Sequence, residues 1–108
     1  MTLGDIVKKL KLKTVVEKNL DHVIRNVYTG DLLSDVMANG EEGSVFVTIQ
    51  AHKNSIAVAT LKDFPAIIIC NSREIPEDMA AAGEEECIGI FQTDMDAFHV
   101  SGCLYNLF

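Results

Sequence analysis

The sequence lacks the glycine-rich loops with which P-loop and dinucleotide-binding proteins hold phosphate groups. Neither Gly-x-x-x-x-Gly-Lys-Ser/Thr nor Gly-x-Gly-x-x-Gly occurs, and without those glycines the backbone cannot wrap closely around a polyphosphate. Ser34 and Asp35 are neighbours, and adjacent side chains on a helix point in different directions. The three histidines have no metal-ligand spacing: His22, His52 and His99. We therefore expect no catalytic centre, no metal and no cofactor.

Long apolar runs and basic residues are also scarce. No apolar run approaches the ~18 residues that a membrane span needs, and the first residues carry Asp5 where a signal peptide has bases. We expect a cytoplasmic protein without a membrane partner. Nine Lys and Arg face 16 Asp and Glu, for a net charge of −7, which disfavours nucleic acid as a partner. The early lysines are interpreted as the solvated face of a helix and the turn after it: Lys8, Lys9, Lys11 and Lys13.

Cysteine is present in an odd number and without a Cys-x-x-Cys pair. That pattern fits neither a secreted disulfide framework nor a zinc site. Cys70, Cys87 and Cys103 each lie among apolar residues, so we expect all three to be small buried hydrophobic side chains.

What the sequence does contain is a set of short apolar runs at 45–49, 66–70 and 88–91, rich in β-branched residues. Such runs are typical of strands buried on both faces of a parallel sheet. Helical patterns separate them, at 55–63 and 77–86. The order predicts one α/β domain over 1–108, with helices packed on a central, mainly parallel or mixed sheet and the three runs next to one another or nearly so.

The flanking segments complete this prediction. Thr2-x-x-Asp5 has capping-box spacing ahead of a short amphipathic helix, and 14–16 and 22–28 are rich in β-forming residues. A second helix is expected through Met37. A last helix is expected after Thr93-x-x-Asp96, which also has capping-box spacing. Its apolar face leaves three aromatic residues without a place, so they either form a self-association surface or fold back on the core: Phe98, Tyr105 and Phe108.

Polar residues follow the predicted strands at the edge where ligands bind in open α/β sheets. The second helix adds a pair of carboxylates expected to share one face, which suits a cation, or a simple helix-capping role for the first of them. The loops suit a nucleotide or other anion, or are ordinary caps. The candidate residues are Asp31, Asp35, Thr48, Gln50, His52, Lys53, Asn71, Arg73 and Thr93.

The segment 28–39, Tyr-Thr-Gly-Asp-Leu-Leu-Ser-Asp-Val-Met-Ala-Asn, resembles the opening motif of stand-alone DRTGG-domain proteins. The similarity continues through 47–50, 56–59 and 66–69. It implies an α/β fold like that of the HPr kinase N-terminal domain and of the DRTGG domains in CBS-domain pyrophosphatases and phosphate acetyltransferases. The loop that gives the family its name reads Ala-His-Lys-Asn-Ser at 51–55, with neither the acid nor the glycines of that signature.

The resemblance further implies a non-catalytic regulatory or protein-interaction module, a homodimer, with a partner linked to iron-only hydrogenase or energy metabolism. The alternative is a small-molecule sensor that binds a nucleotide or another anion at the loop edge of the sheet.

Overall fold

The computed structural model describes all 108 residues and contains a five-stranded sheet with five helices. The longest helix has 10 residues, so none of the five could span a bilayer. The elements are α1 (Leu3–Leu10), β1 (Lys13–Val16), β2 (Val27–Thr29), α2 (Leu33–Asn39), β3 (Val45–Thr48), α3 (Lys53–Leu61), β4 (Ala66–Ile69), α4 (Glu77–Glu86), β5 (Gly89–Gln92) and α5 (Ala97–Tyr105).

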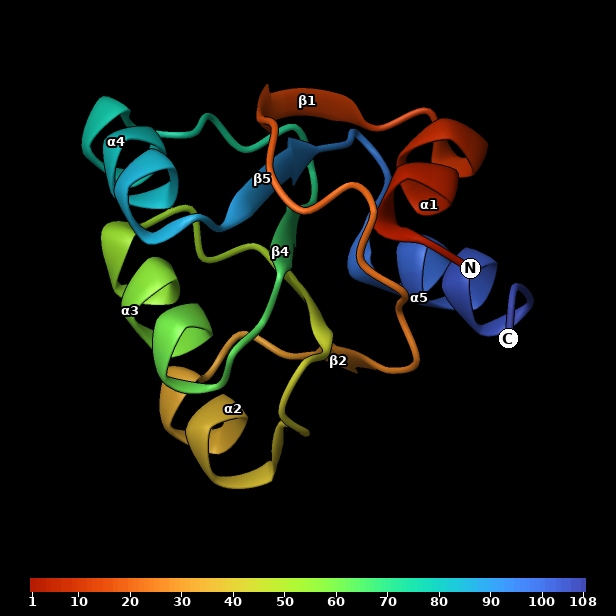
Figure 1. Ribbon diagram of the computed structural model, residues 1–108, viewed down its shortest axis with the longest axis horizontal. Coiled ribbons are helices and arrows are strands. Elements are labelled where there is room, and N and C mark those ends of the chain that lie inside the picture. The colour runs from red at the N-terminus through yellow and green to blue at the C-terminus, as the bar shows by residue number, and fades with distance from the viewer.

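The strand order across the sheet is β1-β5-β4-β3-β2. Strands β2 to β5 run parallel, and β1 closes one edge antiparallel to β5 with Lys13 opposite Gln92. The apolar runs predicted as central strands are β3, β4 and β5, which are neighbours, and β3 and β4 are buried along their whole length. The predicted α/β class and the mainly parallel sheet are confirmed (Figure 1).

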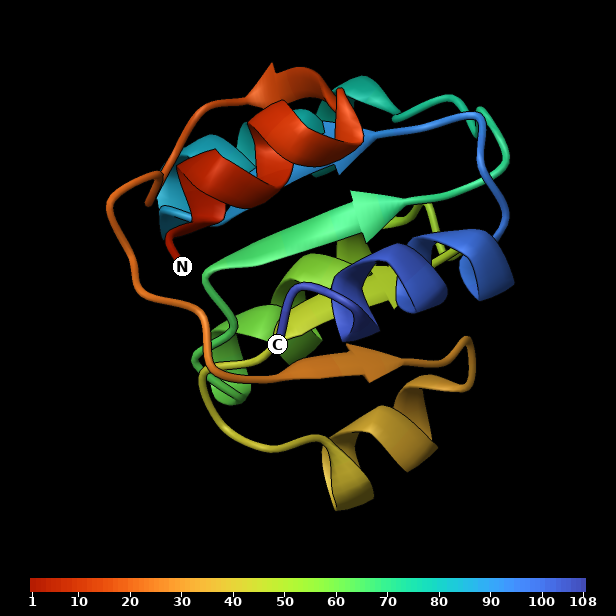
Figure 2. The same cartoon turned by 90° about the vertical axis from the view of Figure 1, so that its right-hand side faces the viewer.

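Helices cover both faces of this sheet (Figure 2). Because β2 to β5 follow one another in a single direction, right-handed crossovers place α2, α3 and α4 on the same face. Their core includes Phe46, Ile67 and Ile90. The opposite face packs against α1 and α5 through residues such as Val47 and Ile68.

The helix starts show which capping patterns the sequence signals correctly. The Thr2 hydroxyl accepts from the Asp5 N–H at 3.2 Å and the Asp5 carboxylate accepts from the Thr2 N–H at 2.9 Å, as the first capping box predicts. These bonds lower the pKa of Asp5. The second box is wrong, because Asp96 itself caps α5 by accepting from the His99 N–H at 2.9 Å. Thr93 instead accepts from the Met95 N–H.

The cysteines differ from the expectation that all three are buried. Cys70 is buried directly after β4, and burial raises the pKa of its thiol to about 11. Cys87 and Cys103 are exposed. Cys87 ends α4 in the left-handed conformation, with φ of 58°, which places it in a turn rather than in the core.

Candidate functional site

The carboxyl ends of the parallel strands meet at one edge of the sheet, and the topology divides this edge in two. The loops after β2, β3 and β4 lead to helices on one face, whereas the loop after β5 leads to α5 on the other face. Neighbouring loops therefore diverge between β4 and β5. Ligand crevices in open α/β sheets form where adjacent loops diverge in this way.

At the β3 end the chain closes the edge with its own carboxylate. One Asp31 oxygen, Oδ1, accepts from the Thr48 hydroxyl at 2.9 Å and from the Ile49 N–H at 3.0 Å. The Gln50 side-chain amide donates to the Asp31 carbonyl at 2.9 Å. The structure thus brings together Asp31, Thr48 and Gln50, and their polar groups bind one another.

Asp35 does not join this network. Its carboxylate accepts from the Tyr28 hydroxyl at 2.6 Å and from the Asn39 amide at 2.8 Å. Both hydrogen bonds lower the pKa of Asp35, and the bond from Tyr28 makes the larger contribution. The expectation that Asp31 and Asp35 share a helical face is wrong, because α2 begins only at Leu33 and Asp31 lies in the preceding loop.

The loop 51–55 is used to start α3. His52 is the N-cap and accepts from the Asn54 N–H through Nδ1 at 3.0 Å. The buried Ser55 hydroxyl donates to the Gln50 carbonyl at 2.7 Å. Lys53 lines a groove between α3 and α4 instead of the sheet edge. These side chains hold the helix start in place.

Backbone hydrogen bonds join the loops after β4 and β5, which contain Asn71 and Thr93. The Asn71 N–H donates to the Met95 carbonyl at 2.9 Å, and the Ser72 N–H donates to the Thr93 carbonyl at 2.8 Å. Asn71 and Ser72 have φ of 62° and 52°, as in a type I′ turn. Arg73 takes part through its carbonyl, which accepts from the Gln92 amide at 2.6 Å.

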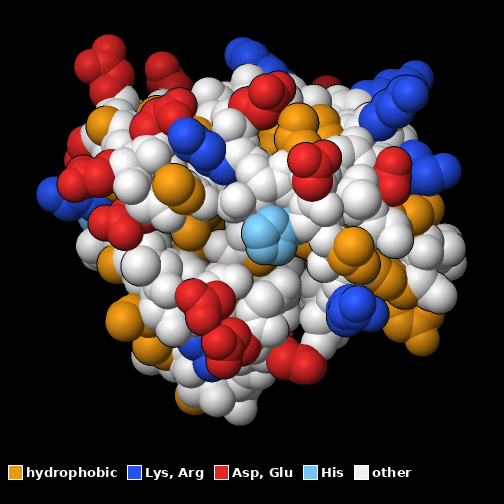
Figure 3. Space-filling model, in the orientation of Figure 1, with side chains coloured by type: hydrophobic (Ala, Val, Ile, Leu, Met, Phe, Trp, Pro, Cys, Tyr) orange, Lys and Arg blue, Asp and Glu red, His pale blue; other side chains and the backbone are white.

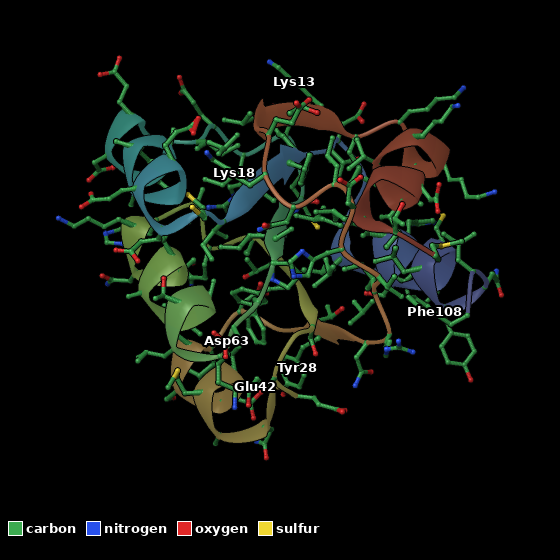
Figure 4. The ribbon with its side chains drawn as sticks, in the orientation of Figure 1. Lys13, Lys18, Tyr28, Glu42, Asp63 and Phe108 are labelled. Carbon is green, nitrogen blue, oxygen red and sulfur yellow. The ribbon has the colours of Figure 1, made fainter.

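Beside these loops lies a pocket of about 230 Å³ that contains no hydrophobic side chain. The antiparallel edge strand β1 brings its first residue, Lys13, to this carboxyl edge, so the interpretation of Lys11 and Lys13 as merely solvated was incomplete. A strand that begins near Lys13 is the sequence signal that could have indicated the position of this lysine at the pocket. Lys13 is labelled in Figure 4, and basic side chains gather over α1 and β1 in Figure 3. The lining residues are Lys11, Lys13, Ser72, Gln92, Thr93 and Asp94.

A second surface feature lies at the C-terminal end, on a different side of the view in Figure 4, where Phe108 is labelled. Phe98, Tyr105 and Phe108, here called the C-terminal aromatic surface, are 80%, 84% and 57% exposed. The alternative in which these rings fold back on the core is therefore wrong. A hollow of about 600 Å³ adjoins two of them and is lined by Arg25, Asn26, Val27, Ser101, Tyr105 and Phe108.

No family model matches this chain, and no curated protein matches it in sequence. A solved structure does match: the CBS and DRTGG domains of the regulatory region of Clostridium perfringens pyrophosphatase, complexed with the activator diadenosine tetraphosphate. The TM-score is 0.68 at 12% sequence identity, over 94% of this chain and 44% of that one. The chain has a DRTGG-like fold. It spans less than half the length of the structure that it matches.

Proposed function

We propose that residues 1–108 act as a single non-catalytic regulatory module in the cytoplasm that works through self-association. The C-terminal aromatic surface is the observation that carries this proposal. The DRTGG-like fold supports it, because the matched structure is described as part of a regulatory region. Diadenosine tetraphosphate is the activator bound in that structure, and a nucleotide-sensing role for this chain is the alternative.

The aromatic surface has the features of an interface rather than of ordinary surface. Phe98 and Tyr105 lie two helical turns apart on α5 and so project from the same side of the helix. Exposed aromatic side chains that cluster are common anchors of protein interfaces. Figure 3 shows hydrophobic side chains gathered at the α5 side of the molecule.

The occupant that fits this surface is a second copy of the chain. Two copies with a net charge of −7 repel each other, so they approach best where acidic groups are absent. The hollow beside Tyr105 and Phe108 is lined by no acidic side chain, and Arg25 carries the only charged side chain of its lining. A two-fold contact uses the same patch on both partners, so the rings of one copy would enter the hollow of the other.

The test is the mass of the protein in solution, measured by light scattering during size-exclusion chromatography at micromolar concentration. We expect about twice the 11.8 kDa of one chain. Tyr105→Glu places two negative charges across the two-fold contact and should give a monomer.

Leu61→Glu is the matched control, because Leu61 is 72% exposed but lies on α3, at the opposite face of the sheet. It should leave the dimer intact. The proposal is refuted if the wild-type protein is monomeric over the whole micromolar range. It is also refuted if Leu61→Glu dissociates the dimer to the same extent as Tyr105→Glu.

The absence of catalysis is tested separately. Purified protein should not hydrolyse ATP or transfer phosphate, since the chain has no glycine-rich phosphate loop. Turnover that a single substitution in this chain abolishes would contradict this. The partner linked to iron-only hydrogenase, implied by the family resemblance, stays a prediction that co-purification with hydrogenase maturation or subunit proteins would test.

A further inference from the structure

Two threonines, at the carboxyl ends of β3 and β5 on either side of β4, have the same local arrangement. Thr48 ends β3, and its hydroxyl oxygen accepts from the N–H two residues later, at Gln50, at 3.1 Å. Thr93 follows β5, and its hydroxyl oxygen accepts from the N–H two residues later, at Met95, at 3.2 Å. Both threonines are buried.

The two hydroxyl groups differ in where they donate. The Thr48 hydroxyl donates to the Asp31 carboxylate, which also accepts from the Ile49 N–H. The Thr93 hydroxyl donates to no group of the chain, and the N–H of the next residue, Asp94, has no acceptor either. At the β3 end, an oxyanion of the protein occupies the position that these donors define. At the β5 end, the corresponding donors have no oxyanion.

The surroundings of Thr93 add positive charge and a further donor. Lys11 and Lys13 line the same pocket, and neither forms an ion pair with an acidic side chain. The Ser72 hydroxyl, also in the lining, makes no hydrogen bond within the chain. Lysine is a common phosphate ligand that acts as a point charge. The volume of the pocket, about 230 Å³, is far above the roughly 10–15 Å³ that a single water molecule needs.

We propose that this pocket binds the phosphate group of a small ligand, with Lys11 and Lys13 supplying charge and Thr93, Ser72 and the Asp94 N–H supplying hydrogen bonds. The phosphate group lies beside Thr93 in the position that corresponds to that of the Asp31 carboxylate beside Thr48. The Asp94 carboxylate, also at the rim of the pocket, disfavours ligands with excess charge and favours one that also carries a donor, such as a hydroxyl or amino group. This proposal is independent of self-association.

The experiment follows the backbone amide signals of the ¹⁵N-labelled protein by NMR during titration with inorganic phosphate at constant ionic strength. The amide signals of Ser72, Thr93 and Asp94 should shift and saturate together. Adenosine monophosphate is titrated in parallel to separate two sources of the phosphate group. If adenosine monophosphate binds with the same affinity as inorganic phosphate, the phosphate group alone is sufficient for binding. If adenosine monophosphate binds more tightly, the ligand is a nucleotide. Acetate is the comparison anion.

Lys13→Gln should weaken phosphate binding about tenfold, the loss expected for one charge-assisted hydrogen bond. Ser72→Ala should weaken it less. Lys8→Gln, an exposed lysine of α1 outside the pocket, should leave it unchanged.

Three results would overturn the proposal. The first is the absence of saturable amide shifts at millimolar phosphate. The second is a loss of phosphate affinity that is equal for Lys8→Gln and Lys13→Gln, which indicates a diffuse electrostatic attraction of phosphate to the lysines near the pocket. The third is acetate binding as tightly as phosphate. Each is read from the folded wild type or from exposed-site variants, so none depends on a variant that fails to fold.

Discussion

The β3 end and the β5 end of the same sheet edge are built from similar residues and are completed differently. At β3, Asp31 accepts from Thr48 and Ile49, and the polar groups bind one another. At β5, Thr93 has a hydroxyl proton without an acceptor, and two lysines stand beside it. The first arrangement fastens a loop to the sheet. The second leaves donors without an acceptor on residues that line a polar pocket.

The difference shows that one strand end of this chain contributes to the stability of the fold, whereas the other is free to bind a ligand. A carboxylate that binds the donors of a strand end stabilises the fold and excludes an external anion from that position. Where no such carboxylate exists, the same donors cost little in stability, because they lie at a pocket open to water, and they remain free for a ligand. The two ends should therefore respond in opposite ways to substitution.

The largest effect is expected from Asp31→Ala. It removes the acceptor of the Thr48 hydroxyl, which is fully buried, and should lower the free energy of unfolding by about 1–3 kcal/mol, the cost of an unsatisfied buried donor. Asp31→Asn keeps an oxygen acceptor and should cost clearly less. Urea denaturation followed by circular dichroism measures both.

The same variant offers a second reading of the comparison. Asp31→Ala vacates a position that accepts an oxyanion, so formate should raise its midpoint of unfolding and leave that of the wild type almost unchanged. If formate stabilises both proteins equally, the Asp31 carboxylate does not occupy an anion position and the likeness of the two strand ends fails.

A smaller effect is expected from Tyr28→Phe, which removes the hydroxyl that binds Asp35. The pKa of Asp35 is lowered in the folded protein, chiefly by this bond. A lowered carboxyl pKa stabilises the fold above the pKa of the unfolded chain, and this contribution disappears as pH falls through the folded pKa. Tyr28→Phe should therefore destabilise at neutral pH, with a gap from wild type that narrows below about pH 4. Denaturation at several pH values measures it, and a gap that is constant with pH contradicts it.

The sequence predicts the fold well because the central strands are continuous apolar runs, such as 45–49 and 66–70, whose burial on both faces leaves few arrangements. It predicts the binding edge only in general. Local polarity does not distinguish Thr48 from Thr93, because the partner that separates them, Asp31, is distant in sequence.

The lysines were missed for a related reason. Lys13 reaches the pocket through the antiparallel pairing of β1 with β5. The local pattern can indicate a strand that begins near Lys13, but not that this strand pairs with β5, because that contact is long-range. The exposed Cys87 was misplaced because its left-handed conformation at a helix end, and not the apolar residues around it, decides its exposure.

The smallest effect, and one of opposite sign, is expected from Ser72→Gly at the β5 end. Ser72 has φ of 52°, a conformation that costs an L-residue about 1–2 kcal/mol. Glycine avoids this cost, but its greater conformational freedom in the unfolded chain lowers the stability of the variant by about 0.4–1 kcal/mol. Ser72→Gly should therefore stabilise the protein slightly while weakening phosphate binding, since the hydroxyl is lost. Cys87→Gly relieves the same conformation, with φ of 58°, far from the pocket, and should stabilise without changing phosphate binding. Thermal unfolding and the phosphate titration of both variants test this. A Ser72→Gly variant that binds phosphate as tightly as wild type would show that the Ser72 hydroxyl takes no part in holding the anion.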